Sequence, residues 1–88
     1  MTAIVKRSSR FTEADIDSEV VVMRLDNGDF FSLSGTGADI WRLIDGSRDR
    51  DALVAALTSE FDADESQIGS EVDDFLKQLR DMDLLAGD

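Results

Sequence analysis

The stretch Glu19–Trp41, EVVVMRLDNGDFFSLSGTGADIW, determines the fold of this 88-residue chain. Residues 19–25 are rich in Val and other strand-forming residues, which is typical of a β-strand. Asn27-Gly28 follows and favours a tight type I′ hairpin turn, because both central residues of that turn need φ > 0. Residues 29–34 then alternate between two faces, so a second strand is predicted over Asp29–Leu33.

The periodicity becomes helical directly after this hairpin. Ser34-Gly35-Thr36-Gly37 supplies residues suited to a helix start, and Ala38, Trp41 and Ile44 recur at helical spacing. We therefore predict a helix over about Thr36–Ile44, ended by Asp45-Gly46. The remaining chain has to cover the apolar face that the hairpin exposes.

The flanking segments add one strand and two helices. Part of Arg10–Ser18 is interpreted as a first strand or extended arm, and a helix capped by Asp49 is expected to reach Phe61. Asp64 then caps a last helix. The apolar stripe of that helix is Ile68, Val72, Phe75, Leu79 and Met82, with Leu76 at its edge.

The order of elements predicts an α+β fold. We expect a three-stranded antiparallel sheet followed by three helices that pack on one of its faces. At this length residues 1–88 form a single domain. Met1–Ser9 is expected to be frayed or weakly structured, with Ile4 and Val5 pairing at a sheet edge. The large core candidates are Phe11, Phe30, Phe31, Phe61, Phe75 and Trp41.

Composition excludes several functions. The chain has no Cys and no His, so it has no disulfide, no thiol nucleophile and no imidazole for acid–base chemistry. No apolar run is long enough to span a membrane and no secretory signal is visible, so a cytoplasmic protein is expected. The net charge of −11 opposes binding to nucleic acid, and most of it lies in residues 45–88, with thirteen acidic and four basic residues.

The sequence motifs that suggest chemistry have simpler explanations. The acidic residues around Asp62 and Asp73 lack the calcium-loop pattern and are interpreted as a solvated helix face, so no metal and no cofactor are expected. Ser34–Gly37 lacks the Lys and the spacing of a phosphate-binding loop. Asp17-Ser18 resembles the phosphopantetheine attachment site of acyl carrier proteins, but Ser18 precedes a Val-rich strand instead of a helix.

A sheet of two or three strands leaves an open edge. Its unpaired N–H and C=O groups can accept a strand from another chain, or they can be protected by twist and by charges such as Asp29. The residues alone favour neither alternative.

The ordered motifs resemble those of the PqqD-like family. Residues 31–46, FSLSGTGADIWRLIDG, are similar to the family signature Y-x-L-N-x-T-G-A-x-I-W-x-L-L-D-G. The resemblance continues through 49–57 and through 71–79, EVDDFLKQL, and ends at Asp83-Leu84-Leu85 where the family has G-L-L. It implies a winged helix-turn-helix-like fold that recognises ribosomally made, post-translationally modified peptides.

The resemblance also implies a binding site. The leader of a precursor peptide would add an antiparallel strand to the third strand and lie between that strand and the third helix. The implied contact residues are Asp29, Phe30, Phe31, Ser32, Leu33, Val72, Phe75, Leu76 and Leu79. Helical periodicity leaves open whether Leu76 or Glu71 faces the groove, and we favour Leu76.

The implied role is a non-catalytic adaptor. It would deliver the precursor to a separate processing enzyme, either a leader peptidase of a lasso-peptide cluster or a radical-SAM maturase, and we favour the lasso type. The alternative is a winged-helix DNA-binding regulator. Asp83 departs from the family Gly, which makes the final turn the least predictable part of the resemblance.

Overall fold

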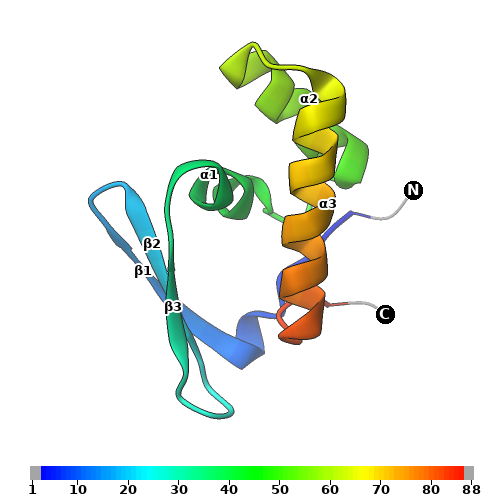
Figure 1. Cartoon of the computed structure of the whole chain (residues 1–88). Coiled ribbons are helices and arrows are strands. Elements are labelled where there is room, and N and C mark those ends of the chain that lie inside the picture. The colour runs from blue at the N-terminus through cyan, green and yellow to red at the C-terminus, as the bar shows by residue number, and fades with distance from the viewer. Residues whose placement is uncertain (1–2, 87–88) are drawn as a thin grey trace.

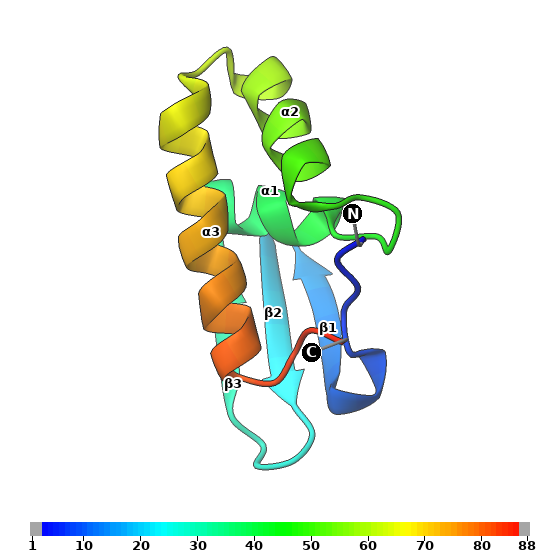
Figure 2. The same cartoon turned by 90° about the vertical axis from the view of Figure 1, so that its right-hand side faces the viewer.

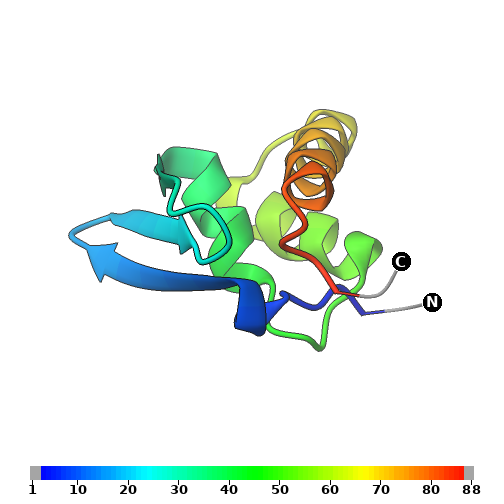
Figure 3. The same ribbon diagram turned by 90° about the horizontal axis from the view of Figure 1, so that it is seen from below.

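The computed structural model describes residues 3–86. Its elements are η1 (Ser8–Arg10), β1 (Phe11–Ile16), β2 (Glu19–Arg24), β3 (Phe30–Leu33), α1 (Gly35–Leu43), α2 (Arg50–Phe61) and α3 (Glu65–Asp81). The three strands form one antiparallel sheet and the helices lie to one side of it (Figures 1 and 3). The predicted α+β fold, three strands followed by three helices, is confirmed.

The sheet has two edges. Its order is β1-β2-β3, so β2 is central while β1 and β3 each have one unpaired side. A two-residue turn, Asp17-Ser18, joins β1 to β2, with Asp17 in the left-handed region at φ 57°. Ser18 thus lies in a hairpin turn, which is unlike the helix start that a carrier protein needs.

The type I′ turn predicted at Asn27-Gly28 is wrong. Only Gly28 has positive φ, at 76°, and its N–H donates to the carbonyl oxygen of Arg24, 3.0 Å away. Asn27 instead accepts a hydrogen bond from the N–H of Asp29 through its side chain. The connection is therefore a longer loop, because the Asn27 side chain stabilises a local turn that competes with the tight one.

The core lies between the sheet and the helices. Val20 and Val22 of β2 are 1% and 0% exposed. Trp41 of α1 is 0% exposed, which confirms its predicted place in the core. The Trp41 ring packs edge-on against Phe11 with centroids 5.2 Å apart, and its Nε1 donates to Glu13 Oε2 at 2.8 Å. The remaining core comes mainly from the helices: Ala38, Ile40, Ile44, Leu53, Val54, Leu57, Ile68, Val72, Phe75, Leu76, Leu79, Leu84 and Leu85, with Ile4.

Two predicted core residues are not in the core. Phe30 is 74% exposed and Phe61 is 44% exposed. Phe30 pairs with Met23 and shares the sheet face opposite the helices, since side chains on a strand alternate. Phe61 is the last residue of α2, whose buried residues are Leu53, Val54 and Leu57.

The helix ends follow the predicted caps. Asp49 accepts a hydrogen bond from the N–H of Ala52, and Asp64 accepts one from the N–H of Ser66. Asp62 ends α2 in the left-handed conformation. Ser34 occupies the N-cap position of α1 without a side-chain capping bond. Local polar residues therefore set two of the three helix starts.

The expectation of a weakly structured N-terminus is wrong for the residues described. Ile4 is 9% exposed and its N–H donates to the carbonyl of Arg48, while Lys6 forms a β-bridge with Leu85. Residues 5–7 therefore pair with residues 84–86 and Ile4 with Arg48, instead of with a sheet edge, so the first and last described segments lie side by side (Figure 2). Met1 and Thr2 lie outside the described residues.

Candidate functional site

The outer edge of β3 offers free backbone groups. Arg24 N donates to Asp29 O across the hairpin, at 2.7 Å. Because hydrogen-bonded and non-bonded pairs alternate in an antiparallel ladder, the next bonded pair is Val22 with Phe31. The N–H and C=O groups of Phe30 and Ser32 therefore point away from β2, towards the open edge.

The side chains of β3 divide between two faces. Phe31 and Leu33 pair with Val22 and Val20, are partly buried and pack against the core. Phe30 and Ser32 are exposed on the opposite face. Asp29 lies one residue before the strand, and its N–H and carbonyl both bond within the hairpin. Only its side chain is thus free to meet a ligand.

The expected helix wall needs correction. Val72, Leu76 and Leu79 are 0%, 2% and 0% exposed, so their side chains belong to the core and present no surface to a ligand. Phe75, 9% exposed, is the member of the set that reaches the surface. Helical periodicity identified the buried stripe correctly, but it did not show that Leu76 at its edge is buried as completely as Val72 and Leu79.

The groove side of α3 is the Glu71 flank. A hollow of about 230 Å³ lies between the start of α1 and α3. Its lining residues are Thr36, Gly37, Ile40, Glu71, Asp74, Phe75 and Gln78. Glu71 thus lines this hollow, whereas Leu76, which we favoured from the sequence, is 2% exposed and lies in the core. On a helix, residues 71, 74, 75 and 78 share one face, so this spacing around Phe75 is the signal that could have identified them.

The hollow and the open edge adjoin each other. A Cβ added at Gly37 would lie 3.6 Å from Phe75 Cε1 and 3.9 Å from Leu33 Cδ2. Gly37 is therefore the point at which β3, α1 and α3 meet. In Figure 1, α1 lies between β3 and α3, and in Figure 2, β3 and α3 both lie towards the left of the view.

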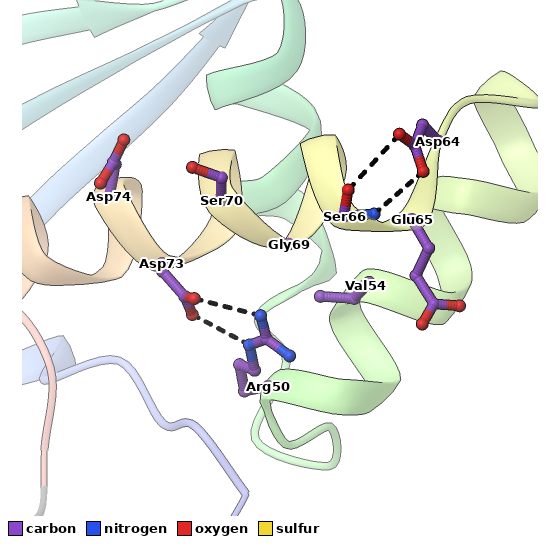
Figure 4. A pocket seen from close by; sticks show the side chains of 9 residues that line it. All are labelled: Arg50, Val54, Asp64, Glu65, Ser66, Gly69, Ser70, Asp73 and Asp74. Atoms are coloured by element: carbon purple, nitrogen blue, oxygen red, sulfur yellow. Dashed lines mark hydrogen bonds and ion pairs between the residues drawn. The ribbon is translucent and has the colours of Figure 1, made fainter.

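A larger and more polar hollow, of about 730 Å³, lies between α2 and α3, away from β3 (Figure 4). Arg50 donates to both carboxylate oxygens of Asp73 there, at 2.9 and 3.1 Å. The hydrogen bond from Arg50 lowers the pKa of Asp73 below its ordinary value. These charges neutralise each other, so we place the candidate site at β3 and not in this hollow.

Lys6 is a largely buried charged side chain, with 17% of its side chain exposed. Its Nζ lies 4.0 Å from the centroid of the Trp41 ring and 3.9 Å from Glu13 Oε2. Burial lowers the pKa of Lys6, and the charge of Glu13 acts in the opposite direction. Lys6 and Glu13 both contact the core residue Trp41. They lie at β1, which is the edge of the sheet opposite β3.

Residues 3–86 contain no group of three or more His, Cys, Asp or Glu side chains placed to hold a metal ion. No helix in this described part of the chain is long and apolar enough to cross a bilayer.

The fold and the site define a small α+β domain with an open strand edge beside a helix, an arrangement that can accept a peptide as an added strand. Residues 19–85 match the family model described as "Coenzyme PQQ synthesis protein D (PqqD)", and the chain belongs to that family.

Two solved structures share the fold. "TbiB1 in Complex with the TbiA(beta) Leader Peptide" is 32% identical, with a TM-score of 0.82 over 90% of this chain and 92% of the other. "Lasso peptide synthetase B1 complexed with the leader peptide" is 17% identical, with a TM-score of 0.82 over 96% of this chain and 98% of the other. None of the curated protein sequences compared with the chain matches it significantly.

Proposed function

We propose that this protein is a non-catalytic adaptor that binds the leader region of a ribosomal precursor peptide by β-strand addition to β3. The observation that carries the proposal is the open edge at Phe30 and Ser32. It belongs to the strand whose last residue, Leu33, lies beside Gly37 of the hollow between α1 and α3. The 32% identical relative, whose structure contains a leader peptide, supports the same role.

The adaptor passes the bound precursor to a separate processing enzyme. We assign that enzyme to the leader peptidase and cyclase of a lasso-peptide pathway, and a radical-SAM maturase is the alternative. Because the precursor is a ribosomal product, the binding step takes place in the cytoplasm.

A DNA-binding regulator with a winged-helix fold has no support. In such a regulator a helix approaches the phosphate backbone, and basic side chains are needed there. Here α3 carries Glu65, Glu71, Asp74 and Asp81 on exposed positions, and the whole chain has a net charge of −11. The charge repels phosphate, so no binding to duplex DNA is expected even at low salt.

The test is a fluorescence-anisotropy titration. Labelled leader peptides come from precursor genes adjacent to the gene for this chain, in both lasso-type and radical-SAM-type contexts, and each has a scrambled copy as its control. The proposal predicts submicromolar binding to one leader and no saturable binding to its scrambled copy. Equal binding of both copies, or binding of neither, overturns it.

A further inference from the structure

Asn27 is the only asparagine in the sequence, and Gly28 follows it directly. Both residues are exposed in the loop that joins β2 to β3. An asparagine carries an amide carbon that the next main-chain nitrogen can reach in a five-membered ring. A side chain on the following residue would hinder that approach, and Gly28 has none. The loop therefore contains the atoms for a reaction between the Asn27 side chain and its own main chain.

The Asn27 side chain is folded back along the main chain. Its Oδ1 accepts a hydrogen bond from the N–H of Asp29, two residues further on, at 3.0 Å. The side-chain carbonyl therefore lies beside the main chain of residues 27–29 instead of extending into solvent. When a nucleophile attacks Cγ, negative charge develops on Oδ1, and the Asp29 N–H is in place to stabilise it.

One hydrogen bond restrains the reaction. The Gly28 N–H donates to the carbonyl oxygen of Arg24 at 3.0 Å, so the nitrogen that would attack is engaged. This bond lies in an exposed loop, where local opening costs much less free energy than unfolding of the domain. Brief opening of the loop therefore frees the nitrogen while the sheet and the helices stay folded.

We infer that Asn27 is a site of spontaneous self-modification in the folded protein, and that one of its products weakens the start of β3. The Gly28 nitrogen loses its proton to hydroxide and forms a bond to Asn27 Cγ. The bond from Cγ to the side-chain nitrogen breaks, and that nitrogen leaves as ammonia with a proton taken from water. The cyclic imide that remains then adds water. Opening at one carbonyl gives an aspartyl residue at position 27, and opening at the other gives an isoaspartyl residue.

The two products differ in their effect on the loop. The aspartyl product keeps a side-chain oxygen in the same place, so the hydrogen bond from the Asp29 N–H persists. The isoaspartyl product sends the main chain through the former side chain and lengthens it by one methylene group. The hydrogen bond that closes the loop, from Arg24 N to Asp29 O at 2.7 Å, spans this lengthened segment. It is therefore weakened, and the start of β3 at Phe30 loses order.

The test is incubation of the whole folded chain at neutral and at mildly alkaline pH. Intact mass and peptide fragmentation that distinguishes aspartyl from isoaspartyl residues follow the reaction. The urea-unfolded chain is the positive control. Asn27→Ser is the negative control, because serine keeps a side-chain oxygen but has no amide to lose. Asn27→Asp supplies the aspartyl product alone.

The folded wild type is expected to gain the mass that replaces a side-chain NH2 by OH, at position 27, at a rate proportional to hydroxide concentration. The isoaspartyl form is then separated by chromatography and compared with Asn27→Asp by amide hydrogen exchange. Its Arg24 amide should exchange about tenfold faster than in Asn27→Asp, the effect of losing one hydrogen bond.

Three outcomes overturn the inference. Folded wild type that gains no mass while the unfolded chain is converted completely would show that the loop protects Asn27. An equal mass gain in Asn27→Ser would place the reaction elsewhere. An isoaspartyl form whose Arg24 amide exchanges as slowly as in Asn27→Asp would remove the effect on β3. The inference does not depend on peptide binding, so each of these results leaves strand addition intact.

Discussion

Asp83 adopts a backbone conformation that glycine adopts at lower cost. Its φ is +61°, directly after α3, and its carboxylate contacts Arg7 at 2.6 Å and Arg10 at 3.3 Å. The family pattern has Gly at this position, and the sequence alone could not show what Asp would do there. The structure keeps the turn, and the side chain gains two exposed ion pairs with the N-terminal segment.

Comparing Asp83→Gly with Asp83→Ala isolates the free-energy cost of the positive φ at position 83. Both variants lose the ion pairs, but only Gly relaxes at positive φ. We expect the Gly variant to be more stable than the Ala variant by about 1 kcal/mol in urea unfolding. An Ala variant as stable as the Gly variant would show that the turn is not strained.

Asp73 makes the free energy of unfolding depend on pH in the acidic range. Its pKa is held below the ordinary value by the Arg50 hydrogen bond, so the folded state binds this proton less readily than the unfolded state. The stabilisation is complete above the unfolded pKa, near pH 4, and is lost as the pH falls through the lower folded value. Asp73→Asn should therefore lose less stability than the wild type as the pH falls from about 5 to about 3.

The matched control is Arg50→Gln, which removes the cause of the shift and leaves the carboxylate. Urea unfolding at both pH values should give the same reduced dependence in Arg50→Gln, in Asp73→Asn and in the double variant. A single variant that keeps the full wild-type dependence would contradict the assignment to this pair.

At the scale of elements, sequence patterns predicted the helices and strands but not which other segments pack against each of them. Asp49 and Asp64 marked helix starts correctly because a cap is a local interaction. The burial of Leu76 depends on the elements that pack on α3, and the pairing of Lys6 with Leu85 joins opposite ends of the chain. Neither has a local signal, so the sequence could not show which flank of α3 is exposed or what the N-terminal segment pairs with.

Ser32→Pro tests whether a peptide adds as a strand to β3. Proline removes the outward N–H of Ser32, which the β2–β3 ladder does not use, so the fold should persist. Leader affinity should fall by about tenfold or more, because a backbone hydrogen bond and the strand geometry are both lost.

Asp15→Pro is the control on the other edge. The same alternation turns the N–H of Asp15 outward on β1, and the variant also loses an exposed ion pair with Arg42. Its leader affinity should equal that of the wild type in the anisotropy assay. An intact Ser32→Pro protein with undiminished affinity would rule out pairing at β3.

At the scale of the molecule, acidic side chains without ion-pair partners among the described residues lie beside the hollow next to β3. Arg50, Arg42 and Arg7 pair with carboxylates from other elements, while Glu71 and Asp74 beside the β3 hollow remain without an ion-pair partner in residues 3–86. From the net charge of −11 we predicted that nucleic acid is not the ligand. The sequence could not show where the acidic residues without ion-pair partners lie, because their positions depend on how α1 packs against α3.

Amide hydrogen exchange, resolved by residue, tests the central claim most directly. The amides of Phe30 and Ser32 point to the open edge and should exchange rapidly in the free protein. With a saturating leader peptide both should become protected, whereas Glu13 and Asp15 on the opposite edge should not change. Protection confined to β1, or no new protection at Phe30 and Ser32 despite saturation, would contradict strand addition at β3.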